Sequence, residues 1–125
     1  REKRAIMGAV SAEYTDYSVF TAEDPRTESL DGILDNMANA AVEIGAIEGK
    51  TFWRVRDRGA AIQFAVDYAQ PGDIVCAFGK GHEQSMCFGT TEHLWDDRTA
   101  MKAALTKHLG TDGPEMPYLP TQDEN

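Results

Sequence analysis

A short apolar run in the middle of the chain ends abruptly in polar residues whose types suit ligand binding. Residues 74–78 (Ile-Val-Cys-Ala-Phe) lead directly into residues 79–83 (Gly-Lys-Gly-His-Glu). Glycine permits sharp turns and a close backbone approach, while Lys80, His82 and Glu83 supply charge and hydrogen-bonding groups. Just past the carboxyl end of a strand, such residues predict a site for a small polar ligand. Taken alone, they fit an ordinary surface turn equally well.

A second polar loop, residues 23–26 (Glu-Asp-Pro-Arg), follows another segment rich in β-forming residues. If both segments are parallel strands, the two loops leave the same edge of the sheet. Arg26 suits a two-pronged contact with a carboxylate, and Glu23, Asp24 or Glu83 can accept hydrogen bonds from an ammonium group. This set predicts a site for a zwitterion such as an amino acid. On residue types alone, a proline β-turn with local charge pairing is the stronger alternative.

The elements that must position these loops alternate along the chain. Apolar spacing and capping residues predict helices over 3–15, 30–44, 57–69 and 97–109, and strands over 17–21, 51–55 and 74–78, with a short antiparallel return over 84–88. This order predicts an α/β, three-layer Rossmann-like fold, with a mostly parallel sheet between flanking helices. Because the chain opens on a helix and has only three main strands, we expect the N-terminal strands of the sheet to be missing. The proline-containing residues 110–125 are expected to form a flexible tail, which leaves 1–109 as the domain.

Composition limits the classes of partner. The 125 residues include 21 acidic and 12 basic side chains, for a formal net charge of -9, which argues against binding to nucleic acid or to an anionic membrane. Cys76 and Cys87 lie in apolar runs and are expected to be buried, reduced thiols. His93 and His108 show no metal-ligand spacing, so no metal site is expected. No signal peptide or membrane-length apolar run is present, so we expect a cytoplasmic location.

Three further features have ordinary structural interpretations. Asp57-Arg58 is expected to be a helix cap with a surface partner. Trp53 and Trp95 are expected to be core or edge aromatics rather than a stacking platform.

Several short motifs occur together in an order found in a known family. They are R-E-K-R-x-I-M-G, E-D-P-R-T-E, D-R-x-x-A-I, P-G-D-I-V, G-K-G-H-E and W-D-D-R, which extend from residue 1 to about residue 109. The sequence resembles the C-terminal domain of the Mur ligases, of the MurE type. The resemblance implies a cytoplasmic, three-domain, ATP-dependent and ADP-forming ligase of peptidoglycan biosynthesis, with Mg²⁺ bridging the ATP phosphates. It implies that a diamino acid is added as the third residue to UDP-N-acetylmuramoyl-L-alanyl-D-glutamate. The fragment alone is expected to bind neither cofactor tightly and to be inactive.

The resemblance also implies which residues bind the incoming amino acid. Glu23, Asp24 and Arg26 match a D-N-P-R motif that contacts the diamino acid, and Gly79 and Glu83 match residues that hold its distal end. Here the motif is E-D-P-R, so a carboxylate stands where the family's diaminopimelate form has an amide. The added negative charge is expected to favour lysine or ornithine over meso-diaminopimelate.

Four other positions belong to motifs with less definite roles. Lys3 and Arg4 match the end of a D-R-x-x-K-R loop near the nucleotide, although a solvated helix start is the stronger interpretation from the residues themselves. Lys80 and His82 belong to the G-K-G-H-E motif without an assigned step. Alternative functions are a related ligase, such as folylpolyglutamate synthase or a MurD- or MurF-type enzyme, and a non-catalytic α/β module that binds a small molecule.

Overall fold

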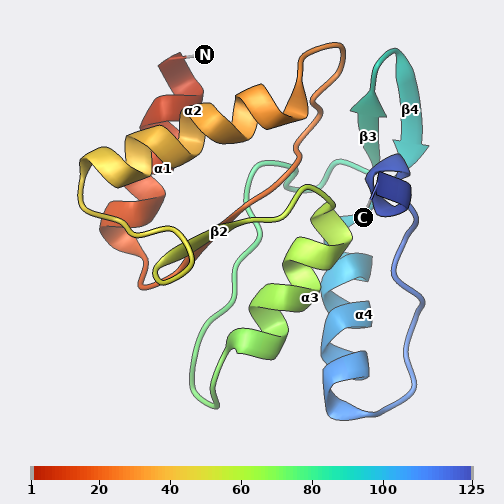
Figure 1. Cartoon of the computed structure of the whole chain (residues 1–125). Coiled ribbons are helices and arrows are strands. Elements are labelled where there is room, and N and C mark those ends of the chain that lie inside the picture. Colours follow the sequence, from red (N-terminus) through yellow and green to blue (C-terminus); the bar gives the residue numbers. More distant parts are fainter. Residues whose placement is uncertain (1, 125) are drawn as a thin grey trace.

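Helices alternate with short strands in the computed structural model, which describes residues 2–124 (Figure 1). The elements are α1 (Glu2–Tyr14), β1 (Ser18–Phe20), α2 (Leu30–Glu43), β2 (Phe52–Arg54), α3 (Arg58–Tyr68), β3 (Ser85–Phe88), β4 (Thr91–Leu94), α4 (Asp97–Leu109) and the short 3-10 helix η1 (Pro120–Glu124). Residues 1 and 125, the outer limits of the expected domain and tail, lie outside the described residues.

The helices begin and end where the capping residues predict. Ser29 accepts a hydrogen bond from the Gly32 amide, and Asp57 accepts one from the Ala60 amide at 2.8 Å. These side chains occupy donors that the first helical turn leaves unpaired. Helix α4 ends at Gly110, whose φ of +70° is the left-handed conformation that glycine adopts without a steric penalty.

A parallel strand pair lies between two helical layers. Strand β1 pairs with β2 in the register Val19–Trp53. Helices α1 and α2 pack together on one side of this pair, and α3 and α4 lie side by side on the other (Figure 1). The predicted α/β fold, a parallel sheet with flanking helices, is therefore confirmed.

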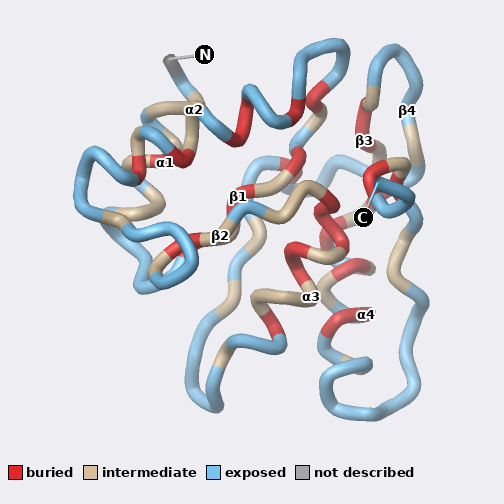
Figure 2. The backbone as a smooth tube through the Cα atoms, viewed as in Figure 1, coloured by how far each residue is buried: buried red, intermediate tan, exposed pale blue. Residues whose placement is uncertain are grey.

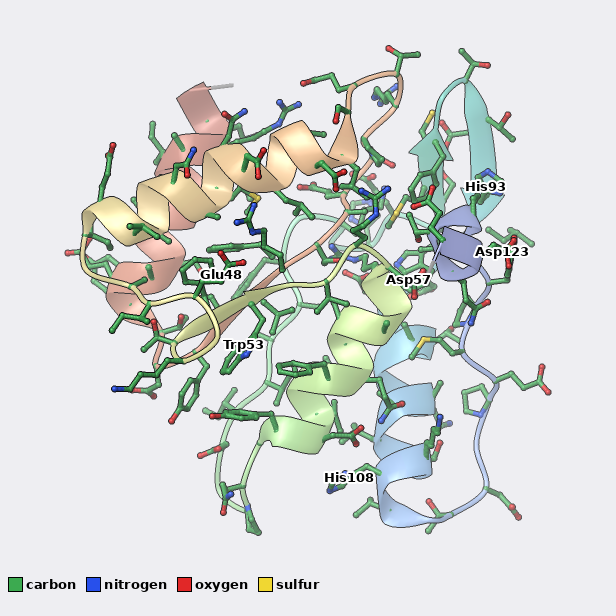
Figure 3. The ribbon with its side chains drawn as sticks, viewed as in Figure 1. Glu48, Trp53, Asp57, His93, His108 and Asp123 are labelled. Atoms are coloured by element: carbon green, nitrogen blue, oxygen red, sulfur yellow. The ribbon has the colours of Figure 1, made fainter. Side chains whose placement is uncertain are left out.

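The core gathers where the helices meet the strands, and outward-facing segments remain exposed (Figure 2). Its largest buried side chains include Phe20, Leu34, Phe52, Met86, Trp95 and Leu119. Trp53 points from β2 toward α3 (Figure 3), where its ring centroid lies 5.1 Å from that of Phe64. Trp95 is thus a core residue and Trp53 an edge aromatic, as expected.

The apolar run at residues 74–78 is extended but is not a buried strand, so this prediction is wrong. Ile74 is 87% exposed and Phe78 is 73% exposed, while Val75 and Ala77 pack against the core. A strand buried on both faces needs bonded neighbours and a cover on each face, whereas only alternate residues of this run contact the core. For the same reason Cys76 is exposed, contrary to expectation, while Cys87 is buried as predicted.

The antiparallel return expected at residues 84–88 pairs with a strand that was not predicted. Strand β3 pairs with β4 in the register Met86–His93, which forms a hairpin rather than an addition to the main sheet. Strand β4 has only four residues, Thr-Glu-His-Leu, which are mostly exposed. Because it contains a single apolar residue, no alternating pattern predicts it.

The segment after α4 packs back onto the domain. Leu119 is 1% exposed, and the Thr121 hydroxyl donates to the Asp57 carboxylate at 2.7 Å. Figure 3 shows Asp57 at the first turn of α3, close to the C-terminal 3-10 helix. These contacts lie within residues 110–125, the segment expected to form a flexible tail. The sequence did not indicate these contacts, because isolated apolar residues between prolines show neither helical nor strand periodicity.

Within residues 2–124 we find no helix that combines the length and apolar character required to cross a lipid bilayer.

Candidate functional site

The two polar loops predicted to form a site meet through a buried lysine. The Lys80 side chain is almost fully buried, and its Nζ lies 2.8 Å from Oδ2 of Asp24 and 2.9 Å from Oε1 of Glu83. Asp24 belongs to the loop after β1, and Glu83 to the loop after residues 74–78. One ammonium group therefore donates charge-assisted hydrogen bonds to a carboxylate from each loop. The sequence left Lys80 without a role, and the structure places it between the loops.

A second contact joins the loops at Gly79. This glycine has a φ of +105°, and a Cβ built on it would lie 2.6 Å from Cδ of Glu23. The Glu23 carboxyl group therefore packs directly over the α-carbon of Gly79. Any side chain at this position would displace Glu23 as well as adopt an unfavourable backbone conformation. The glycine thus determines how closely the loops approach.

The loop at residues 23–26 holds two non-glycine residues in the left-handed region. Asp24 has a φ of +43° and Arg26 a φ of +55°. Hydrogen bonds to the end of β3 hold this shape: the Cys87 amide donates to Asp24 Oδ1 at 2.8 Å, and the Gly89 amide donates to the Arg26 carbonyl at 2.7 Å. Such strained conformations cluster at binding and catalytic sites, where the surrounding structure must maintain them.

Burial and charge act in opposite directions on the central pair. Burial favours the neutral form of Asp24, but hydrogen bonds from Lys80 and the Cys87 amide outweigh it, and the pKa of Asp24 lies below its ordinary value. Burial likewise disfavours the charged form of Lys80, but the bonds to Asp24 and Glu83 outweigh it and raise the pKa of Lys80. Both groups therefore remain charged at neutral pH.

Most of the remaining candidate side chains are open to solvent. Arg26, His82 and Lys3 are exposed. Arg4 pairs with Glu28, with Nη1 2.8 Å from Oε2, so the start of α1 is tied to the loop that follows Arg26. The pairing of Arg4 is a structural role that the sequence did not predict.

Sequence reasoning missed two residues that support both loops. Arg58 follows the α3 cap, but it is buried rather than paired at the surface as expected, and its partner is Asp97 at the start of α4. The D-R-x-x-A-I and W-D-D-R motifs contain these two residues, so they were noted but given no place in the site. Their pairing joins positions 39 residues apart, which spacing alone does not reveal.

A comparison with known families assigns this arrangement. The family model described as "Mur ligase, glutamate ligase domain" matches residues 1–81. The chain belongs to the Mur ligase family. The expected resemblance is thereby confirmed, and the chain corresponds to the C-terminal domain of a Mur ligase.

Individual relatives of this Mur ligase domain are of the MurE type. The chain is 40% identical over 113 residues to the UDP-N-acetylmuramyl-tripeptide synthetase of Roseiflexus sp. (strain RS-1), which covers 90% of the chain and 22% of the relative. It is 36% identical over 112 residues to the UDP-N-acetylmuramoyl-L-alanyl-D-glutamate--2,6-diaminopimelate ligase of Bacillus cereus, again over 90% of the chain and 22% of the relative. The chain spans about a fifth of the length of these relatives.

A solved structure shares the fold of this Mur ligase domain. It is a UDP-N-acetylmuramoyl-L-alanyl-D-glutamate--2,6-diaminopimelate ligase with a TM-score of 0.73 and 30% sequence identity, matched over 86% of the chain and 21% of the solved chain.

The Mur ligase domain also has a hollow near the start of α4. It measures about 270 Å³, and its lining comprises Gln84, Leu94, Trp95, Asp96, Thr99 and Pro117. None of the predicted substrate-binding residues is among them. Among residues 2–124 no three His, Cys, Asp or Glu side chains are placed to hold one metal ion. His108 instead pairs with Asp67, and His93 packs against the ring of Phe88 (Figure 3).

Proposed function

We propose that the loops at residues 23–26 and 79–83 bind the amino acid that a full-length MurE-type ligase adds to its nucleotide precursor. In that enzyme ATP phosphorylates the terminal carboxylate of UDP-N-acetylmuramoyl-L-alanyl-D-glutamate. The amine of the incoming diamino acid then attacks the acyl phosphate, which gives an amide, ADP and phosphate. The domain contributes by holding that amine in place, which lowers the entropic cost of the reaction.

The observation that carries this proposal is the Lys80 bridge between Asp24 and Glu83. It brings the loops together, with the exposed Glu23 carboxylate packed against Gly79 of the other loop, and the Arg26 side chain is also exposed. A guanidinium group can bind the α-carboxylate of an amino acid, and a carboxylate can bind an ammonium group. The strained Asp24 and Arg26 backbones support a binding role for the same loop.

The charge of the site supports a choice among diamino acids. Three carboxylates, those of Glu23, Asp24 and Glu83, stand against the two cations Lys80 and Arg26. The excess negative charge favours the bare distal ammonium group of lysine or ornithine and disfavours the distal carboxylate of meso-diaminopimelate. We therefore propose lysine or ornithine as the third residue added.

The test is a ligation assay on the full-length enzyme with lysine, ornithine and meso-diaminopimelate as competing substrates. We expect Asp24→Asn, which restores the amide of the D-N-P-R motif, to shift the ratio of kcat/KM values about tenfold toward meso-diaminopimelate. Glu13→Gln, at an exposed carboxylate on α1, is the matched control and should leave the ratio unchanged. A wild-type preference for meso-diaminopimelate would contradict the proposed choice of substrate. If none of the three amino acids supports ATP-dependent amide formation, the proposed ligase activity itself is contradicted.

The cofactors and location belong to the whole enzyme in this proposal. ATP and Mg²⁺ bind mainly to residues of other domains, the enzyme is cytoplasmic, and the 125-residue chain alone is inactive. We further propose that the C-terminal domain extends through Glu124 rather than ending at residue 109, because Leu119 and Thr121 are buried against it. ATP-dependent amide formation by the 125-residue chain would contradict the proposed division of labour.

A further inference from the structure

One buried guanidinium group contacts the residue that precedes each candidate binding loop. Nη1 of Arg58 donates to the carbonyl of Ala22 at 3.0 Å, and Nη2 donates to the carbonyl of Phe78 at 2.9 Å. Ala22 immediately precedes the loop at residues 23–26, and Phe78 immediately precedes the loop at residues 79–83. Arg58 therefore links the two chain segments just before the loops begin, whereas Lys80 links residues within the loops.

The orientation of this guanidinium group is determined by the start of α4. Nε and Nη2 of Arg58 donate to the two oxygens of Asp97 at 2.8 and 2.7 Å, which is a bidentate pair. The indole of Trp95 donates to the same carboxylate at 2.7 Å. Arg58, Trp95 and Asp97 are each less than 10% exposed, so water does not compete for these bonds.

We propose that Arg58 is a positioning residue that sets the spacing between the two loops, and so the affinity for the incoming amino acid. This inference rests on the proposed function. Phe78 lies in an extended segment without strand partners among the described residues, so the backbone ladder of a sheet does not hold its carbonyl. The hydrogen bond from Arg58 supplies that restraint, and Asp97 keeps the donor aimed correctly.

Lysine cannot replace arginine in this arrangement. The guanidinium group presents five donors in a planar fork, and the structure uses it for a carboxylate and two separate carbonyls. An ammonium group carries the same charge but radiates its three donors from a single atom. Arg58→Lys therefore keeps the ion pair with Asp97 available while it releases at least one of the two loops.

The experiment measures steady-state kinetics of the full-length enzyme with each substrate varied in turn. For Arg58→Lys we expect the KM for the amino acid to rise about tenfold, while the KM values for ATP and for the nucleotide precursor stay within about twofold. Trp95→Phe removes the indole donor to Asp97 together with part of a buried ring, and should raise the amino-acid KM about threefold. Arg54→Lys is the matched control, because Arg54 pairs with Glu48 and Asp35 at the surface, and should change none of the three.

An amino-acid KM within twofold of wild type for Arg58→Lys overturns the inference, and so does an equal rise in all three KM values. If Arg58→Lys does not fold, Trp95→Phe is measured in its place. An unchanged amino-acid KM, or an equal rise in all three KM values, then overturns the inference. Arg26→Ala separates this inference from the proposed function. If Arg26→Ala leaves the amino-acid KM unchanged, the proposed binding site itself fails. If it raises that KM and Arg58→Lys does not, only the positioning role is overturned.

Discussion

Oδ2 of Asp24 lies 2.8 Å from Nζ of Lys80, although 56 residues separate the two in sequence. This pair is the direct link between two loops whose motifs, taken singly, also fit ordinary surface turns. Glu83 completes the arrangement from the same loop as Lys80, at 2.9 Å. The Lys80 ammonium group thus turns inward and cross-links the two loops.

Replacing Lys80 by methionine should destabilise the domain. The change keeps an unbranched apolar chain about as long as the lysine stem but leaves Asp24, which is only 22% exposed, without its ammonium partner. Because Glu83 remains half-exposed and can be hydrated, we expect a loss of about 3 kcal/mol in the free energy of unfolding. Urea denaturation of the 125-residue chain measures it. Lys102→Met, at an exposed lysine of α4, should change the value by less than about 0.5 kcal/mol. Equal effects of the two substitutions would contradict the bridging role.

Stability should fall at both extremes of pH. The pKa of Asp24 is lower in the folded chain than its ordinary value of 3.8, so its contribution is present above 3.8 and is lost as the pH falls from there toward the folded-state pKa. The pKa of Lys80 is raised above 10.5, so its contribution is present below 10.5 and is lost as the pH rises through the higher folded-state value. The measurement is the free energy of unfolding against pH for wild type and Lys80→Met. The difference between them should be largest between about pH 4 and pH 10, and a difference independent of pH would contradict this account.

Gly79→Ala should weaken amino-acid binding by displacing Glu23. The new Cβ would lie 2.6 Å from Cδ of Glu23, and the φ of +105° is itself unfavourable for alanine. We expect the amino-acid KM of the full-length enzyme to rise about tenfold. Gly72→Ala separates the two effects, because Gly72 also has a positive φ, +95°, but nothing lies within 4 Å of its Cβ position. If both variants raise the KM equally, backbone strain rather than contact with Glu23 is responsible.

Leu119→Ala should show that the C-terminal segment is part of the folded domain. Leu119 is 1% exposed, so truncation leaves a cavity and should lower the free energy of unfolding by about 2–4 kcal/mol. Leu109→Ala, at a leucine that is 68% exposed at the end of α4, should cost less than about 1 kcal/mol. If the chain beyond residue 109 were a mobile tail, Leu119→Ala would leave the free energy of unfolding unchanged and Leu109→Ala would have the larger effect.

Local patterns were sufficient wherever a structure depends on residues close in sequence. The helices follow from 3.6-residue spacing and from caps such as Ser29, Asp57 and Gly110, whose interactions extend over only three or four positions. The candidate loops also followed from local types, because glycine, proline and clustered charges mark turns after strands. The motif order was specific enough to predict the family, which the comparison confirmed.

Residues 74–78 show where local patterns fail. Five consecutive apolar residues predicted a buried strand, but whether such a run is buried depends on which other elements cover it. Here Ile74 and Phe78 face outward, and only the alternate side chains reach the core. The same limit applies to Leu119, because its burial in the core cluster depends on residues distant in sequence and not on its proline-rich neighbours.

The sequence by itself determined the helices, the two paired strands β1 and β2, and the family, because each depends on short-range spacing or on motif order. The residues expected to bind a zwitterion remain a prediction. Only the tertiary structure decided how those residues are used. It turned Lys80 inward between Asp24 and Glu83, and it aimed Arg58 at both loops through Asp97. The physical reason is that a buried charge requires partners, and those partners come from segments that the chain brings together only when it folds.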